Sequence, residues 1–195
     1  LAIKNNGTLW GWGLNTYGQL GDGTNVKKNN PVQIGSATNW SSVNACLAHS
    51  LAIKTDGTLW AWGLNNNSQL GDGTNTNSNI PIKIGTDTDW KEITGGTYHS
   101  LALKTNGTLW GWGYGGPDDF LLGSGFPSIV PVQRGTDTDW AAISGDRSHT
   151  LAIKTDGTLW GWGSNLFGQL GNGTISGSFI TQIGTDTWTK VFATS

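Results

Sequence analysis

Hydrophobic and polar residues alternate in short runs that recur every 50 residues along the chain. The clearest run is LAIKTDGTLWAW from Leu51, and closely similar runs begin at Leu1, Leu101 and Leu151. A fixed period of this length is typical of architectures that stack one supersecondary unit on the next. We therefore predict a single repeat region, residues 1–195, made of four units: 1–50, 51–100, 101–150 and 151–195.

The repeated run has the pattern of a β-hairpin. Residues 51–54 alternate in polarity, residues 58–62 are β-branched and aromatic, and Asp56-Gly57 lies between them. Asp-Gly or Asn-Gly between two such runs favours a tight hairpin, because the turn needs positive φ. The other copies place Asn6-Gly7, Asn106-Gly107 and Asp156-Gly157 at the same point.

Two further strands are predicted in each repeat. The third is Pro31-Val32-Gln33-Ile34, with counterparts from Pro81, Pro131 and Ile180, and a proline is tolerated at the first position of a strand. The fourth begins at a tryptophan in each copy: Trp40, Trp90, Trp140 and Trp188. Four strands per repeat without a helical period predict an all-β fold, a β-propeller of four-stranded blades.

The segments between these strands are rich in Gly, Asn and Asp, which indicates surface loops. Within them Leu20, Leu70 and Leu170 are expected to anchor each loop on the core. The 12 tryptophans recur at equivalent positions in the four copies, so we interpret them as core residues between blades rather than as a carbohydrate platform.

Three motifs resemble the RCC1 (regulator of chromosome condensation) repeat. They read WKEITGGTYHSLA from Trp90, DGTLWAWG from Asp56 and GQLGDGT from Gly18, and the similarity extends over essentially the whole chain. The resemblance implies a propeller, commonly of seven blades, that works as a protein-binding surface. Family members include a Ran nucleotide-exchange factor and a secreted bacterial β-lactamase inhibitor. Ran exchange itself is not expected, because no repeat carries a long inserted element.

The four copies differ in two places, residues 14–30 with their counterparts and the segment before each hairpin. Strand direction puts both sets at one end of the blades, opposite the Asp-Gly turns. Exposed aromatic and arginine side chains are enriched in interface hot spots. We therefore predict a partner-binding face with these candidates: Tyr17, Leu47, Tyr98, Asp118, Asp119, Phe120, Arg147 and Phe167.

A protein partner is the favoured hypothesis for this face. One alternative is a structural or spacer module of a larger surface or secreted assembly, in which the loops only cap the blades. Another is a glycan-binding module that uses exposed aromatics such as Tyr17 and Phe167.

Charge and titratable residues argue against several other functions. The net charge is −2 and only 12% of residues are charged, so the basic patch that nucleic acid requires is not expected. No membrane-length apolar run is present. His49, His99 and His149 recur at one blade position, which indicates a structural role rather than the single convergence of a catalytic site. We predict that the chain is not an enzyme and binds no cofactor or metal. The GDGT loops, which contain Asp22 and Asp72, show only a faint similarity to calcium-binding loops.

Sparse charge with abundant Asn, Thr and Gly suggests an exported bacterial protein. The chain starts and stops in the same phase of the repeat, so Trp188–Val191 could join Leu1–Trp12 in one sheet and close a ring. Because related blades commonly pack seven to a ring, we instead predict an open four-blade arc that is completed by further repeats or a second copy.

Overall fold

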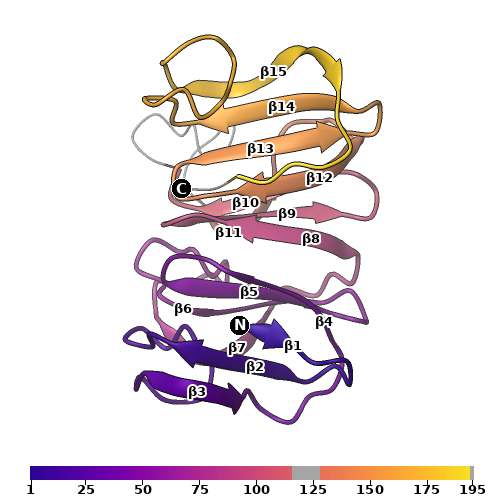
Figure 1. Ribbon diagram of the computed structural model, residues 1–195. Coiled ribbons are helices and arrows are strands. Elements are labelled where there is room, and N and C mark those ends of the chain that lie inside the picture. The colour runs from indigo at the N-terminus through magenta and orange to yellow at the C-terminus, as the bar shows by residue number, and fades with distance from the viewer. Residues whose placement is uncertain (116–127, 194–195) are drawn as a thin grey trace.

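The computed structural model describes residues 1–115 and 128–193, and this part of the chain is all β. Its strands form four antiparallel sheets that follow one another in an open stack (Figure 1). The first sheet has three strands and each of the others has four. The prediction of an all-β propeller built from repeated blades is confirmed. No helix that could span a membrane occurs among the described residues.

The strands run in chain order within every sheet. The first sheet contains β1 (Ala2–Ile3), β2 (Leu9–Gly13) and β3 (Lys28–Gln33). The second contains β4 (Trp40–Ala45), β5 (His49–Lys54), β6 (Leu59–Gly63) and β7 (Ser78–Ile84). The third contains β8 (Trp90–Gly95), β9 (His99–Lys104), β10 (Leu109–Gly113) and β11 (Ser128–Gln133). The fourth contains β12 (Trp140–Gly145), β13 (His149–Lys154), β14 (Thr158–Gly163) and β15 (Ser178–Thr187).

Sheets and sequence repeats are offset by one strand. The strand that begins at Trp40 closes the first sequence repeat, yet it pairs with β5 of the second in the register Val43↔Ala52. The same offset recurs at β8 and β12. These first strands contact one another from sheet to sheet and are called the inner strands below, whereas β3, β7, β11 and β15 form the outer edges.

The Asp-Gly hairpins form as predicted, and their turns require glycine for two reasons, the positive φ and a close backbone contact. Gly57 has a φ of 75°, and a Cβ there would lie 2.0 Å from the carbonyl oxygen of Thr88. Asp56 Oδ1 accepts hydrogen bonds from Thr58 N at 3.0 Å and Thr58 Oγ1 at 2.6 Å, which fixes the turn. The loop before the next inner strand therefore packs directly onto the hairpin turn.

The outer strands differ from their prediction in position. β3 starts at Lys28, three residues before Pro31, so the proline lies inside the strand rather than at its first residue. It is tolerated because β3 is an edge strand with a register shift between Gly11 and Gly13 of its neighbour.

The hydrophobic core lies between consecutive sheets. One cluster joins Leu51, Leu59 and Leu70 of the second sheet to Trp90 and Trp112 of the third, and equivalent clusters lie in the other two spaces. Trp62, Trp112 and Trp162 are fully buried, so the core role predicted for the repeated tryptophans holds in these copies. Leu20, Leu70 and Leu170 are also buried, as predicted.

The predicted fourth strand of the last repeat does not form. β15 instead continues to Thr187, which pairs with Thr158, and Trp188 lies just beyond the strand. In the other copies this tryptophan pairs with the first hairpin strand of the next sheet, for example Trp40↔Lys54. β1 pairs with β2 alone in its three-stranded sheet, so the arc is open rather than closed through Leu1–Trp12.

Candidate functional site

The two ends of the sheets carry different loops. At one end, which we call the variable end, the turn before each hairpin contacts the loop that follows it: Leu64 N donates to Ala48 O at 2.9 Å and Tyr114 N to Tyr98 O at 2.8 Å. At the opposite end, Thr55 N beside the Asp-Gly turn donates to Asn39 O at 2.8 Å. The two segments that vary between repeats thus lie together.

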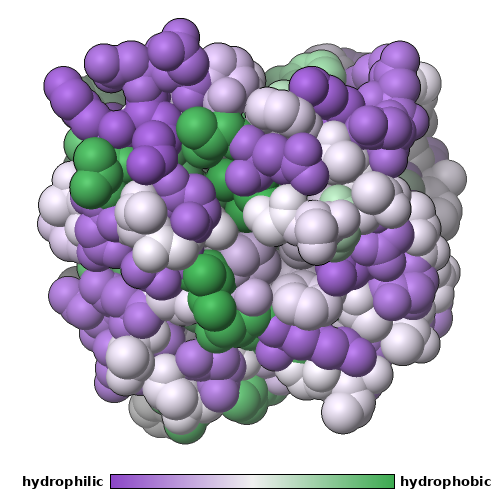
Figure 2. Space-filling view, turned by 90° about the horizontal axis from the view of Figure 1, so that it is seen from below, coloured by the Kyte–Doolittle hydropathy of each residue, from purple (hydrophilic) through white to green (hydrophobic). Residues whose placement is uncertain are grey.

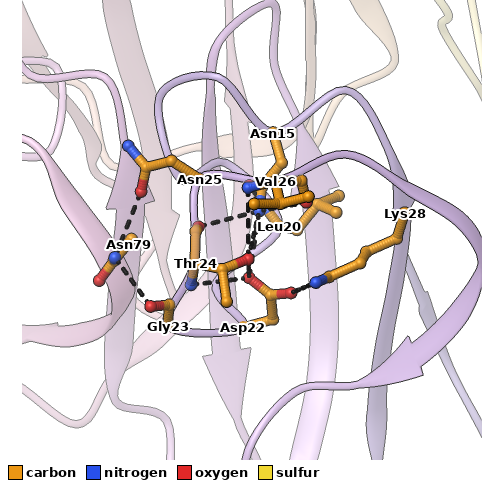
Figure 3. A network of polar contacts seen from close by, with 9 residues as sticks. All are labelled: Asn15, Leu20, Asp22, Gly23, Thr24, Asn25, Val26, Lys28 and Asn79. Carbon is orange, nitrogen blue, oxygen red and sulfur yellow. Dashed lines mark hydrogen bonds and ion pairs between the residues drawn. The ribbon is translucent and has the colours of Figure 1, made fainter.

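The long loops of the variable end are held by a repeated polar network (Figure 3). Asn15 Nδ2 donates to Asp22 Oδ1 at 3.1 Å and to Thr24 O at 2.9 Å, while Asn15 Oδ1 accepts from Leu20 N at 2.9 Å. Asn79, from the second sheet, donates to Gly23 O at 3.0 Å. The buried amide of Asn15 therefore organises the loop from inside, and a neighbouring sheet fixes its tip.

The Asp22 carboxylate is fully engaged in this network. It accepts from Thr24 N at 3.0 Å and Thr24 Oγ1 at 2.8 Å, and it pairs with Lys28 Nζ at 3.1 Å. Partial burial raises the pKa of Asp22, but the hydrogen bonds from Thr24 and the contact with Lys28 outweigh it and hold the pKa below its usual range. In the fourth repeat Asn172 makes the equivalent contacts with Asn165 and Thr174. A structural role needs only the side-chain oxygen, and this explains why an amide can replace the carboxylate.

The same loops join one sheet to the next. The carbonyl oxygen of Gln19 accepts hydrogen bonds from Ser50 Oγ at 2.7 Å and from Trp62 Nε1 at 2.9 Å, both on the second sheet. Gln69 O accepts equivalently from Ser100 Oγ and Trp112 Nε1, on the third. Each loop is therefore a rigid connection as well as an exposed surface.

Leu47 and Arg147 line one pocket of the variable end. This pocket measures about 280 Å³ and lies where the turns before the hairpins of three sheets converge. Gly95, Gly96 and Asp146 are also part of its wall. Leu47 is 51% exposed and Arg147 is exposed, so a cation and an apolar side chain are both available at one cavity.

Arg147 also borders a second, more apolar pocket with Phe167. This pocket measures about 500 Å³ and includes Leu166 and His149. Phe167 is 92% exposed, and its backbone N–H donates to Gln169 Oε1 at 2.9 Å, which holds the loop that carries the ring. Arg147 thus connects two cavities, one polar and one apolar.

The remaining predicted site residues are more scattered. Tyr17 and Tyr98 are exposed on their own loops and line neither of these two pockets. Asp118, Asp119 and Phe120 lie outside the described residues. Further exposed apolar residues of the variable-end loops were not among the predicted candidates: Leu14, Val26, Tyr114, Leu166 and Ile175. Leu14 and Leu166 could not be recognised by type, because Leu64 at the position equivalent to Leu14 is buried.

The recurring histidines are buried, and the first of them contacts the following sheet. His49 Nε2 lies 2.8 Å from Ser100 Oγ, and the Ser100 hydroxyl donates to Gln69 O, so the imidazole is the donor in the first contact. Burial, with a smaller effect of His99, lowers the pKa of His49 to about 3, and burial lowers the pKa of His99 to about 4. Both rings are therefore neutral near pH 7. Cys46 lines the 280 Å³ pocket, and burial of its thiol raises its pKa to about 12, so the thiolate is disfavoured.

Repeated four-stranded sheets joined by buried tryptophans, with variable loops at one end, define a propeller built of tandem blades. Residues 6–53 and 56–103 match the protein-family model described as Regulator of chromosome condensation (RCC1) repeat. Residues 41–69 and 144–169 match a second family model of the same description. The chain belongs to the RCC1 repeat family. No curated protein sequence matches it significantly.

Solved structures of RCC1-type propellers resemble the fold. Human WBSCR16 is 25% identical with a TM-score of 0.81, and the match covers 94% of this chain and 50% of that chain. Yeast RCC1 (Prp20), solved bound to Kap60, is 20% identical with a TM-score of 0.79, covering 94% and 46% of the two chains. A second structure, that of Prp20p from Saccharomyces cerevisiae, a protein described as binding Gsp1p and histones, is 20% identical with a TM-score of 0.78, and the match covers 90% of this chain and 46% of that chain. This chain therefore spans about half the length of the structures that it matches.

Proposed function

We propose that the chain is a non-catalytic scaffold that binds a protein through its variable end. The observation that carries the proposal is the position of Arg147, which borders the pocket of Leu47 on one side and that of Phe167 on the other. A guanidinium beside exposed apolar side chains is typical of interface hot spots. RCC1-repeat propellers are commonly protein-binding scaffolds, and the yeast relative was solved bound to another protein.

Rigidity supports the same proposal. The loops that present Tyr17 and Phe167 are fixed from inside by Asn15 and Asn165, so little conformational entropy is lost when a partner binds. An apolar cavity beside a polar one matches the mixed composition of ordinary protein interfaces. Tyr98, Asp118, Asp119 and Phe120 extend the proposed face in this hypothesis.

The test uses a photoreactive amino acid placed at position 167 of the full chain, with position 132 as the control. Val132 is 41% exposed, but it lies on the outer strand β11, where it pairs with Gly111 in the middle of the sheet. A partner that is cross-linked from position 167 and not from position 132 is then purified, and its affinity is measured for the wild type and variants. Arg147→Ala and Phe167→Ala should each weaken binding at least about 30-fold, whereas Val132→Ala should not. Equal affinity for all four proteins would overturn the proposal.

The glycan-binding alternative has its own test. It requires Tyr17 and Phe167 to meet sugar rings, and a glycan array probed with wild type and Phe167→Ala would show a difference at specific spots. Loss of a specific glycan signal in Phe167→Ala, together with no cross-linked protein, would favour that alternative over the protein scaffold.

A further inference from the structure

A groove of about 360 Å³ lies between the second and third sheets, and it shares no lining residue with the two pockets of the variable end. Its apolar lining includes Trp90, which is 4% exposed, together with the half-buried Trp110 and Pro131. Three charged side chains line it as well. Pockets for small molecules combine apolar walls with a few polar groups and begin at about 300 Å³. The groove therefore has the size and the lining of a small-molecule site.

Polar and charged side chains alone do not mark a site on this protein. Figure 2 shows many of them on the face that is seen from the side of β1–β3, around a band of apolar residues. A charge in such a position is surrounded by water. The charges of the groove differ, because they lie beside tryptophan side chains in a hollow between two sheets.

Two of the three charges in the groove have no partner of opposite sign. Asp87 is paired, because its Oδ2 lies 2.6 Å from Lys104 Nζ. Within the described part of the chain, Asp72 and Lys83 form no ion pair, either with each other or with another residue. The groove thus has one carboxylate and one ammonium group that are not neutralised by the protein.

The first sheet shows which group Asp72 lacks. There the equivalent Asp22 binds Lys28 Nζ through Oδ2 at 3.1 Å (Figure 3). In the second sheet Ser78 replaces Lys28 as the first residue of the outer strand. Asp72 Oδ1 makes the hydrogen bonds that hold the loop, whereas Oδ2 accepts, among the described residues, only from Thr74 Oγ1 at 2.9 Å. Asp72 Oδ2 therefore offers a place for an ammonium group that this repeat does not supply.

Lys83 is likewise an exception among the repeats. Glutamines stand at the equivalent positions 33, 133 and 182, and each donates through Nε2 to the carbonyl of the glycine two residues later, at 3.0, 3.1 and 3.2 Å. Lys83 makes no such bond within the described residues, and its side chain is exposed at the groove. An ammonium group forms its strongest hydrogen bonds with carboxylate or phosphate oxygens. The repeat that lacks the cation beside its aspartate thus has an additional cation on the outer strand.

We infer that this groove binds an α-amino acid with an apolar side chain. The ammonium group of the ligand binds Asp72 Oδ2, as Lys28 binds Asp22 in the first sheet. The carboxylate of the ligand binds Lys83, and its apolar side chain lies against the indole of Trp110. A zwitterion suits the groove because it neutralises both charges at once. A simple cation or anion would leave one of them beside apolar walls without a partner.

The first experiment titrates the full chain, labelled with ¹⁵N, with L-phenylalanine and follows the indole N–H signal of Trp110 by NMR. The signal should shift until it saturates, with a Kd on the order of 1 mM for a ligand of this size. Two analogues test the charges: 2-phenylethylamine lacks the carboxylate, and 3-phenylpropanoate lacks the ammonium group. Each should bind at least about 10-fold more weakly than L-phenylalanine. No saturable shift, or an affinity for either analogue equal to that for L-phenylalanine, would overturn the inference.

The second experiment assigns each charge of the ligand to its residue. Asp72→Asn should weaken the binding of L-phenylalanine at least about 10-fold and leave that of 3-phenylpropanoate unchanged. Lys83→Gln should weaken the binding of L-phenylalanine at least about 10-fold and leave that of 2-phenylethylamine unchanged. Both variants should fold, because Asn172 and Gln33 occupy these positions in other repeats.

The matched controls make the same changes of charge outside the groove. Asp156→Asn introduces the residue that Asn106 already is in the third repeat, where it makes the same contacts with the following threonine. Lys27→Gln removes an exposed ammonium group from the first long loop. Both controls should bind L-phenylalanine as the wild type does. Wild-type affinity in either groove variant, or an equal loss in the controls, would show that the ligand does not bind between Asp72 and Lys83.

Discussion

Trp112 Nε1 donates a hydrogen bond of 2.9 Å to the main-chain carbonyl of Gln69, 43 residues earlier and in the preceding sheet. Ser100 Oγ donates to the same oxygen at 2.7 Å. The carbonyl is thus shared between two buried donors that both belong to the next sheet. The loop contributes only a main-chain carbonyl to this contact, so its side chains can vary while the loop stays attached to the next sheet.

We predict that Trp112→Phe destabilises the chain by about 0.5–1.5 kcal/mol beyond the loss of packing, since it removes one of the two donors to a buried carbonyl while Ser100 Oγ still donates to it. Trp112→Ala should cost about 3–5 kcal/mol through the cavity that it leaves. Urea unfolding followed by circular dichroism measures both values. The matched control is Trp12→Ala, which should cost much less because Trp12 is 45% exposed. Equal costs at the two positions would contradict this prediction.

A second prediction concerns the hairpin glycines. Gly57→Ala should destabilise the chain by more than about 2 kcal/mol, because the new Cβ would overlap Thr88 O at 2.0 Å in addition to the strain of positive φ. Gly85→Ala has a similar φ of 63° with no atom within 4 Å, so only the strain of about 1 kcal/mol applies. Thermal unfolding of the two variants gives the comparison. Similar midpoints would show that the turn yields to the added methyl group.

The sequence was sufficient to predict the hairpins because each depends on local chemistry, Asp56-Gly57 between two alternating runs. The burial of Leu70 was equally predictable, since it is the apolar residue of a polar loop. The extent of the outer strands was not, because Lys28 and Ser78 join their strands through register shifts at neighbouring glycines rather than through any pattern of their own. Short-range patterns do not record such shifts.

For the candidate site, the end of the blades could be predicted from strand direction, but the grouping of residues within it could not. Arg147 comes close to Leu47 and Phe167 only because three sheets converge at the inner strands. The exposure of Leu14 and Leu166 depends on what packs over each loop, and the repeats differ in this respect. Tertiary packing, rather than residue type, decides these positions.

The buried histidines make stability dependent on pH. In the folded chain the pKa values of His49 and His99 are about 3 and about 4, below the ordinary 6.5, so the unfolded chain binds more protons below pH 6.5. Their contribution is therefore fully present above pH 6.5 and is lost as the pH falls toward those folded values. Each histidine should add a slope of up to about 1.4 kcal/mol per pH unit between pH 6 and pH 5.

His99→Gln tests this dependence. Whatever its effect at pH 7, the variant should show a shallower loss of unfolding free energy between pH 7 and pH 5 than the wild type. Trp12→Phe, which leaves all three histidines in place, should keep the wild-type slope. An unchanged slope in His99→Gln would mean that the ring is protonated in the folded chain, contrary to its burial.

The GDGT loops give the last prediction, which separates a structural carboxylate from a metal ligand. Asp72 Oδ1 accepts from Asn65 Nδ2 at 3.0 Å and from Thr74 N at 2.9 Å, and Asn172 makes the equivalent contacts in the fourth repeat. Asp72→Asn should therefore change stability by less than about 0.5 kcal/mol, whereas Asp72→Ala should cost about 1–2 kcal/mol because it removes the acceptor that joins Asn65 Nδ2, Thr74 N and Thr74 Oγ1. Thermal unfolding with and without millimolar Ca²⁺ provides the measurement. A midpoint that rises with Ca²⁺ in the wild type and not in Asp72→Asn would assign the loop to a metal, because only the charged carboxylate would then bind.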